Sequence, residues 1–438
     1  MMIKKAGLTG LLLFGMFFGA GNLIFPPSLG ALSGEQFWPA IWGFVLSGVG
    51  IAVLTLIIGM LNPKGYVEEI SQKISPWFAT LYLVMLYLSI GPFFAIPRTA
   101  TVAYEVGVAP MLSSNIGAMG LGLFTLCYFL AAYFIALNPS KILDSIGRIL
   151  TPIFALLIVI LMGLGVAQYG ENIPQSSATD YAQNAFGTGF IEGYNTLDAL
   201  AAVAFSLVAI QTLKQLGFRS RKEYVSTIWL VGIVVALGFS VLYIGLAYLG
   251  NRFPVPAEVM NADINKGVYI LSQATQAIFG QSAQWFLAIM VAMTCFTTTA
   301  GLIVSTAEFF ALRFPRFSYK HYATLFTLIG LAIANLGLNT IIRFSLPVLL
   351  ILYPITITIV MLVIVNKGFA LSKVGMQLTI VLVTFVSFAG VVGEQCQILF
   401  ITEWINRLPF AHLSLPWLMP ALVGLALALI LPHRQRDI

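Results

Sequence analysis

The chain has 438 residues, of which 59% are hydrophobic and only 9% are charged. A soluble domain carries roughly 25% charged residues, so this chain cannot cover a globular surface with polar groups. The net charge of +6 does not indicate a nucleic-acid binder, because the basic residues stand between apolar blocks, where they usually set membrane topology. Those blocks run for about twenty residues, the length of a spanning helix, and do not show the alternation of a β-barrel strand.

Twelve apolar blocks predict a single all-α domain with twelve membrane-spanning helices. They cover approximately residues 6–30, 37–61, 76–104, 117–137, 142–169, 189–213, 224–250, 283–311, 321–337, 340–365, 374–393 and 413–432. The first block follows Lys4 and Lys5, as in a signal peptide. It continues through Pro26 without an A-x-A cleavage site, so we expect it to remain as a helix.

Lysine and arginine are distributed unequally between the two sides of this topology. With a cytoplasmic N-terminus, seventeen of the 22 basic residues fall on the cytoplasmic side: Lys4, Lys5, Lys64, Lys73, Lys141, Arg148, Lys214, Arg219, Arg221, Lys222, Arg313, Arg316, Lys320, Lys367, Lys373, Arg434 and Arg436. The opposite side carries Arg252, Lys266, Arg343 and Arg407, and Arg98 lies within a span. This asymmetry follows the positive-inside rule and predicts that both termini are cytoplasmic.

The first span contains residues that interrupt a helix. Gly19 and Gly21-Asn22 precede the pair Pro26-Pro27, and inside a helix each glycine costs about 1 kcal/mol and each proline about 3 kcal/mol relative to alanine. Unwound backbone at that depth is tolerated only where it is buried in protein or lines a cavity. Its carbonyls can bind a cation, and the following half-helix N-terminus favours a carboxylate. Helix packing through Gly15 and Gly19 is the alternative, but it does not account for the other residues.

The eighth span carries four hydroxyls within six residues, at Thr294, Thr297, Thr298 and Thr299. Helical spacing places the first three on one face, where hydroxyl and carbonyl oxygens could coordinate a monovalent cation. The alternative is that these threonines bond back to the preceding turn and serve helix packing.

Arg98 in the third span and Asp198 in the sixth are ionisable, and both fall in the outer half of their spans. An intramembrane charge is a functional candidate, and these two could pair across a pathway as a gate. Snorkelling or a local structural bridge is the alternative. Glu105 and Glu308 lie nearer span ends, where solvated or structural roles are expected.

A long connection, 251–282, contains Pro254, Pro256 and the amphipathic run Val268–Leu271. It predicts a short helix that folds back over an entrance, with an ordinary structured loop as the alternative.

No enzyme site is visible in the spans. Cys127, Cys295 and Cys396 have no metal-ligand spacing and are interpreted as small buried hydrophobes. The three histidines lie at span ends or in loops, and no repeated filter-like segment suggests a channel. The sequence therefore favours a carrier of a small solute.

Three motifs then resemble one known family. The runs Gly19–Pro27, Gly91–Thr101 and Gly193–Ala201 look like signatures of the bacterial branched-chain amino acid–cation symporters. That family is similar to the amino acid–polyamine–cation superfamily. The resemblance implies a LeuT-like fold of two inverted repeats (approximately 6–169 and 189–365) and two extra helices (approximately 374–432), with spans 1 and 6 broken near the midplane. The stretch Leu200–Ser206 departs from the pattern, because it contains no glycine or proline.

The resemblance also implies two sites. Na⁺ would lie between the first break and the eighth span, bound by the carbonyls of Gly15 and Phe18 and by Thr294, Thr297 and Thr298. The substrate carboxylate would face Ala20, Gly21 and Asn22, with Phe205 and Ser206 beside the amino group and side chain. A second Na⁺ at Asn22 is a further possibility.

We therefore expect Na⁺-coupled import of leucine, isoleucine and valine by alternating access across a bacterial inner membrane. Na⁺ acts as coupling ion, and no cofactor, nucleic acid or obligate protein partner is expected. The alternative is a proton-coupled or exchange transporter of another neutral amino acid.

Overall fold

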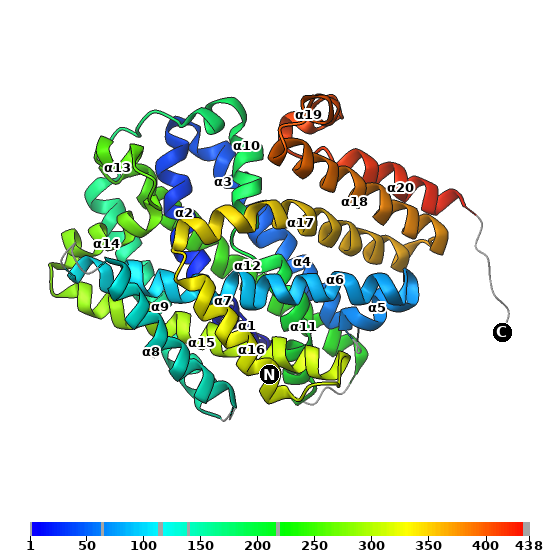
Figure 1. The fold of residues 1–438 in the computed structure, drawn as a ribbon, viewed down its shortest axis with the longest axis horizontal. Coiled ribbons are helices and arrows are strands. Elements are labelled where there is room, and N and C mark those ends of the chain that lie inside the picture. Colours follow the sequence, from blue (N-terminus) through cyan, green and yellow to red (C-terminus); the bar gives the residue numbers. More distant parts are fainter. Residues whose placement is uncertain (1, 63–64, 113–116, 138–140, 216–219, 432–438) are drawn as a thin grey trace.

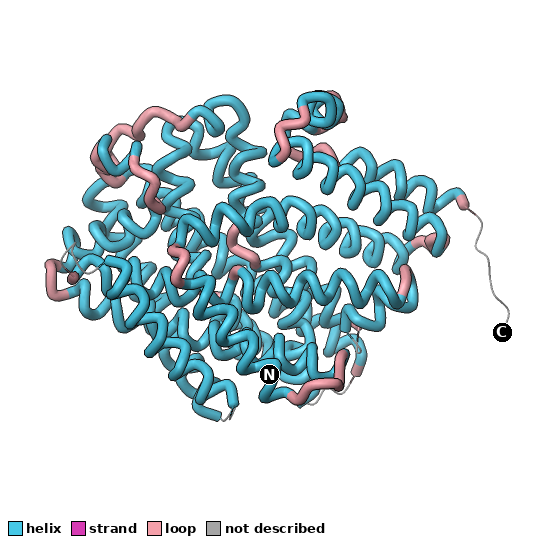
Figure 2. Tube along the Cα trace, viewed as in Figure 1, coloured by secondary structure: helices cyan, strands magenta, loops and turns pink. Residues whose placement is uncertain are grey.

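The computed structural model describes residues 2–62, 65–112, 117–137, 141–215 and 220–431, and this part of the chain is helical without any strand (Figures 1 and 2). Lys64, Arg219, Arg434 and Arg436, together with residue 432 at the end of the twelfth predicted span, lie outside it. Within the described ranges, eight helical segments are long and apolar enough to cross a membrane, and Ile153–Tyr169 and Leu418–Ile430 are shorter apolar helices. The exact count of twelve spans stays a prediction.

Each predicted span falls on one helix or on a run of helices. The first six correspond to α1 (Met2–Phe17) with α2 (Ala20–Ser33); η1 (Gly34–Gln36), α3 (Phe37–Val45), η2 (Leu46–Ile51) and α4 (Ala52–Leu61); α6 (Pro76–Leu88), η3 (Ser89–Phe93), α7 (Ala95–Val102), η4 (Ala103–Val108) and η5 (Ala109–Met111); α8 (Gly117–Leu137); α9 (Lys141–Tyr169); and α10 (Thr179–Tyr194) with α11 (Asp198–Gln215). The last six correspond to α12 (Arg221–Arg252), α15 (Ala283–Arg313), α16 (Tyr319–Ala334), α17 (Leu338–Gly368), α18 (Lys373–Gln395) and α20 (Leu418–Ile430).

Large apolar side chains cover much of the outer surface. Leu237, Val381 and Phe385 are each about 60% exposed, at 62%, 61% and 61%. Leu237 lies on α12, and Val381 and Phe385 lie on α18, so the exposure is not confined to one helix. Helices that are apolar on their outer face as well as their inner face are typical of a protein whose surroundings are lipid.

The predicted interruption of the first span is confirmed, but it lies at Phe18 and Gly19, before Gly21. Gly19 is extended, with φ −130° and ψ −170°, and α2 begins at the next residue. Gly21 therefore belongs to the first turn of α2, and Pro26 and Pro27 lie in its interior. Since proline has no N–H, Pro26 and Pro27 leave the carbonyls four residues earlier without their helical partners but do not end the helix.

The sixth span is also interrupted, between α10 and α11, at Asn195, Thr196 and Leu197. Leu197 has a left-handed backbone, with φ 65°. A leucine rarely adopts this conformation, and it ends α10 sharply. The helix α11 then runs unbroken through Leu200–Ser206, so the expected unwinding lies just before that stretch rather than within it.

Three glycines let α2 pack closely on its neighbours. A methyl group at Gly30 would lie 1.8 Å from the carbonyl oxygen of Ala247, and one at Gly250 would lie 2.1 Å from that of Pro27, so α2 and α12 meet backbone to backbone. A methyl group at Gly267 would lie 1.7 Å from the carbonyl oxygen of Ile24. These contacts hold the second half of the first span against α12 and against a helix of the connection after it.

That connection contains α13 (Ala257–Asn261) and α14 (Lys266–Phe279), which confirms the predicted short helix. Asn265 caps α14 by accepting a hydrogen bond from the Val268 N–H at 3.1 Å. Ile270 and Leu271 are buried, and Gln284 in α15 donates to the Val106 carbonyl at 2.7 Å beside it. The helix α14 thus lies between α2 and the end of the third span, and covers this end of the helix bundle (Figure 1).

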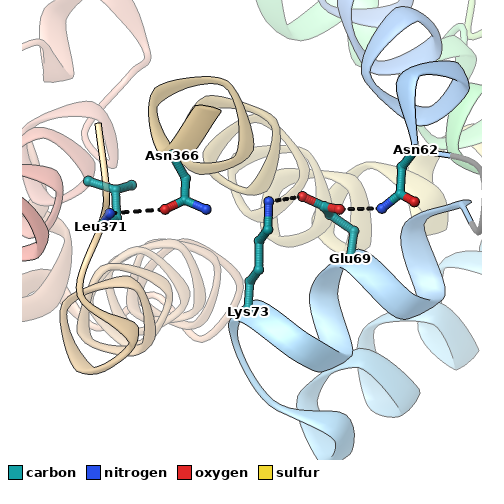
Figure 3. A network of polar contacts seen from close by, with 5 residues as sticks. All are labelled: Asn62, Glu69, Lys73, Asn366 and Leu371. Carbon is teal, nitrogen blue, oxygen red and sulfur yellow. Dashed lines mark hydrogen bonds and ion pairs between the residues drawn. The ribbon is translucent and has the colours of Figure 1, made fainter. Parts of the chain in front are cut away.

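A short helix, α5 (Gly65–Lys73), connects α4 to α6. Glu69 accepts hydrogen bonds from Asn62 at the end of α4 and from Lys73 one turn further along α5 (Figure 3). Near this junction, Asn366 in α17 accepts from the Leu371 N–H at 2.9 Å and closes the turn towards α18. Polar contacts therefore hold both connections. The remaining short helices, α19 (Leu399–Asn406) and η7 (Ala411–Leu413), join α18 to α20.

Candidate functional site

A cavity lies where the two interrupted spans meet. It has about 40 Å³ of free space and lies between α1, α2, η3, α7, α11 and α15. The residues that line it are Met16, Phe17, Gly19, Ala20, Gly21, Asn22, Ile90, Ala95, Arg98, Thr99, Thr196, Leu197, Asp198, Ala201, Phe205, Thr298 and Leu302. Both breaks therefore open onto one space, which is partly polar and partly aliphatic.

The two halves of the first span present opposite ends to this cavity. The helix α2 starts at Ala20 without a side-chain cap, so N–H groups of its first turn have no intrahelical partner. The last turn of α1 presents carbonyls, and that of Phe17 accepts from the Asn22 side-chain amide at 3.3 Å. Helix dipoles make the α2 end favourable for an anion and the α1 end favourable for a cation.

The predicted cation ligands are partly brought together. The Thr298 hydroxyl donates to the carbonyl of Phe18 at 3.5 Å, directly across the break, and a methyl group at Gly19 would lie 3.5 Å from the Thr298 Cγ2. Thr297 and Thr298 also bond back to the Thr294 carbonyl, at 2.9 and 3.2 Å, as expected of helical threonines. The buried hydroxyl of Thr294 has no partner among the described residues.

Gly15 lies in the last turn of α1, three residues before Phe18. Neither Gly15 nor Phe18 is among the residues that line the cavity, and Thr298 is the one predicted cation ligand that does. The Thr298–Phe18 contact brings two members of the predicted set together, and the set as a whole stays a prediction.

Arg98 reaches the cavity from α7, just after a kink. Gly91 in η3 has non-helical angles (φ −92°, ψ −125°) and Pro92 follows it, so α7 starts in a new direction. The Arg98 side chain donates to the Asn195 carbonyl at 2.6 Å and lies 5.2 Å from the centre of the Phe25 ring. It therefore connects the break in the sixth span to α2.

Asp198 is the first residue of α11 and is buried. It accepts hydrogen bonds from the Asn22 amide at 3.4 Å and from the Tyr243 hydroxyl in α12. Arg98 and Asp198 both line the cavity, as the gate hypothesis requires, yet the described residues include no ion pair between them.

The two residues predicted beside the substrate side chain are separated. Phe205 lines the cavity and packs edge-on against Phe17, with ring centres 5.2 Å apart. Ser206 lies on another face of α11, where it donates to the Val203 carbonyl at 2.7 Å and fills the space beside Gly59 of α4. Ser206 is thus placed at a helix contact, outside the cavity lining.

Several residues near the site were not found from the sequence. Tyr243 is one of three tyrosines in α12, and no local sequence pattern distinguishes it. Thr99 lines the cavity and shares a hydroxyl contact with Thr299, which also bonds Tyr128 at 2.9 Å. A signal was available for Asn195 and Thr196, because consecutive polar residues before Asp198 are unusual inside a span.

Comparison with known proteins identifies the family. The model of the branched-chain amino acid transport protein family matches residues 2–435. A candidate branched-chain amino acid carrier from Staphylococcus saprophyticus is 40% identical over 429 residues, covering 96% of this chain and 95% of that protein. Another from Staphylococcus aureus is 38% identical over 430 residues, covering 97% and 95%.

Solved structures show the same architecture at low sequence identity. The inward-facing conformation of Mhp1 has a TM-score of 0.60 at 14% identity, covering 96% of this chain and 89% of that one. MhsT in complex with L-phenylalanine has a TM-score of 0.57 at 15% identity, covering 96% and 98%. The fold is LeuT-like, as predicted. With its two interrupted spans around one cavity, the chain is a multi-pass membrane protein that belongs to the family of branched-chain amino acid transport proteins.

Proposed function

We propose that this protein imports leucine, isoleucine and valine together with Na⁺, by alternating access, across the inner membrane of a bacterium. The observation that carries the proposal is the contact between the Thr298 hydroxyl and the Phe18 carbonyl, 3.5 Å apart, at the edge of the shared cavity. It joins α15 to the broken first span at the point where main-chain groups of the break would face a bound ion.

Cation chemistry fits this point. A carbonyl at the C-terminal end of α1 carries negative partial charge, and oxygen atoms of carbonyls and hydroxyls are suitable ligands for a hard cation. An ion between Phe18 and Thr298 would hold α1, α2 and α15 in one arrangement. The amino acid would then meet a preorganised α2 N-terminus, so each ligand raises the affinity for the other by the same factor.

The rest of the cavity fits an aliphatic amino acid. Ile90, Ala201, Phe205 and Leu302 give the lining an apolar part beside the polar groups of the breaks. Such an apolar lining distinguishes one methylene by only about 1–3 kcal/mol, so overlapping transport of the three branched substrates is expected.

The test uses the purified full-length protein in proteoliposomes with labelled leucine. An inward Na⁺ gradient should drive accumulation, and unlabelled isoleucine and valine should compete. A proton gradient imposed without Na⁺ should drive none. Accumulation under the proton gradient alone, or leucine exchange that needs no ion gradient, would instead establish the alternative proton-coupled or exchange carrier.

A further inference from the structure

Two side chains of opposite charge, Arg98 and Asp198, border the cavity without direct contact between them. Arg98 is 3% exposed and Asp198 is 4% exposed, and both line the cavity. In the described part of the chain, neither forms an ion pair. Isolated buried charges are costly, and a ligand with complementary charges would offset that cost.

Arg98 has donors left over at the α2 end of the cavity. One terminal nitrogen is bonded to the Asn195 carbonyl, while Nε is buried without a partner. A methyl group at Gly21 would lie 3.1 Å from the other terminal nitrogen, Nη2, so the guanidinium lies across the first turn of α2. A carboxylate placed there would receive bonds from Arg98 and from free N–H groups of that turn.

Asp198 offers the opposite chemistry near the end of α1. The partners of its carboxylate include the Asn22 amide at 3.4 Å, the Tyr243 phenol and the Thr196 hydroxyl, which are neutral groups. An ionised carboxylate can accept about four hydrogen bonds, so it keeps capacity for a further donor. The Asn22 amide that it contacts also reaches the Phe17 carbonyl, which places Asp198 close to the electronegative end of α1.

From this arrangement we propose that Arg98 and Asp198 form a zwitterion site, in which Arg98 and the α2 N-terminus bind the α-carboxylate and Asp198 binds the α-ammonium of the substrate. The inference rests on the proposed transport of amino acids, whose head group it assigns. The two charges are then specificity determinants that exclude molecules lacking either group. The aliphatic side chain is left to the wall formed by Ala201, Phe205 and Leu302.

The test separates the two ends of the substrate with leucine analogues. Isocaproate lacks the amino group of leucine, and isoamylamine lacks the carboxylate. In Na⁺, labelled leucine bound to the purified wild-type protein should be displaced by leucine, and by neither analogue at about a hundredfold excess, because each analogue leaves one buried charge unpaired. If isocaproate displaced labelled leucine from the wild-type protein as effectively as leucine does, the proposal would be overturned, and no variant would be needed.

Variants then assign each end. Asp198→Asn should weaken leucine binding about tenfold or more while sparing isocaproate, so that the preference for leucine over isocaproate collapses. Arg98→Gln should likewise abolish the preference for leucine over isoamylamine. Glu105→Gln is the matched control, since this carboxylate in the third span accepts from the Leu338 N–H and does not line the cavity. It should leave both preferences unchanged.

These binding experiments distinguish failure of the zwitterion site from failure of the proposed transport function. Absence of leucine binding to the wild-type protein, with or without Na⁺, would end both proposals, whereas leucine binding that does not depend on Na⁺ would end only the proposed Na⁺ coupling. Leucine binding that Asp198→Asn leaves unchanged would overturn this inference alone. Thermal stabilisation by Na⁺ without leucine provides a last check: Asp198→Asn should retain it, and its loss would assign Asp198 to the cation instead of the ammonium group.

Discussion

At the scale of single residues, Thr298 is a predicted Na⁺ ligand whose hydroxyl contacts the carbonyl of Phe18, another predicted Na⁺ ligand. Replacing it with valine keeps the shape but removes the hydroxyl that faces the Phe18 carbonyl. A hydrogen bond or ligand bond to a charged group contributes about 1.5–3 kcal/mol, so the Na⁺ concentration for half-maximal leucine uptake should rise about tenfold or more.

Two further variants complete this experiment. Thr298→Ser should restore the Na⁺ dependence, because it restores the hydroxyl. Thr306→Val, which removes a buried hydroxyl without a partner two turns along α15, should leave it unchanged. Equal Na⁺ dependence of Thr298→Val and wild type would exclude Thr298 as a ligand.

At Gly21, an added methyl group would push the interrupted part of the first span away from that of the sixth span. Alanine is preferred to glycine in helices by about 1 kcal/mol. At Gly21, however, the new methyl group would lie 3.3 Å from the Thr196 Cα and 3.4 Å from the Asn195 carbonyl oxygen. Overpacking of this kind costs about 1–3 kcal/mol, so the clash should outweigh the gain in helix propensity.

The prediction is that Gly21→Ala lowers leucine uptake and the melting temperature. The control is Gly163→Ala in α9, where the methyl group would have no neighbour within 4 Å. That variant should match or exceed the wild-type melting temperature. Wild-type uptake by Gly21→Ala would show that the breaks do not need this close approach.

From the sequence alone, local chemical signals led to residues that line the cavity, and their roles stay predictions. Charges inside apolar spans pointed to Arg98 and Asp198, and glycine pointed to the first break. Prediction was less successful for side chains whose position depends on helix rotation. Ser206 and Phe205 are adjacent, yet one contacts α4 and the other lines the cavity. Tyr243 approaches Asp198 only through the packing of α12 against the centre of the molecule.

At the scale of elements, the helix blocks could be predicted because lipid demands long apolar segments. The exact positions of the breaks could not. Pro26 and Pro27 suggested an interruption, but α2 continues through them while packed against α12. The break in the sixth span depends on Leu197 adopting a left-handed conformation, for which leucine itself gives no signal.

The packing of α14 on α2 leads to a prediction at this scale. Gly267→Ala would place a methyl group 1.7 Å from the Ile24 carbonyl oxygen, so α14 must move away from α2. Because α14 packs on α2, which lines the cavity, this displacement should loosen α2 and increase the labelling rate of a cysteine introduced by Ala95→Cys about tenfold.

The measurement uses a membrane-impermeant thiol reagent on intact cells, in a background without Cys127, Cys295 and Cys396. Gly163→Ala again serves as the control and should leave the labelling rate unchanged. An unchanged rate in Gly267→Ala would mean that α14 does not control access.

At the scale of the whole molecule, the unequal distribution of lysine and arginine predicts a topology with both termini in the cytoplasm. A fluorescent protein fused to the C-terminus should therefore fluoresce. Alkaline phosphatase inserted in the connection between α12 and α15 should be active, since it would be exported. The reverse pattern of the two reporters would show that the orientation is opposite.

Part of the cavity is bordered by the interrupted main chain, at the end of α1, at the start of α2 and between α10 and α11. A mutation replaces a side chain but leaves the peptide group in place. Main-chain contacts to the substrate should therefore change little through point mutations. Cells selected for resistance to a poisonous leucine mimic, while still growing on leucine, should therefore carry changes in the aliphatic wall. A change in substrate specificity should therefore arise at Ala201, Phe205 or Leu302, and not at the interrupted backbone itself.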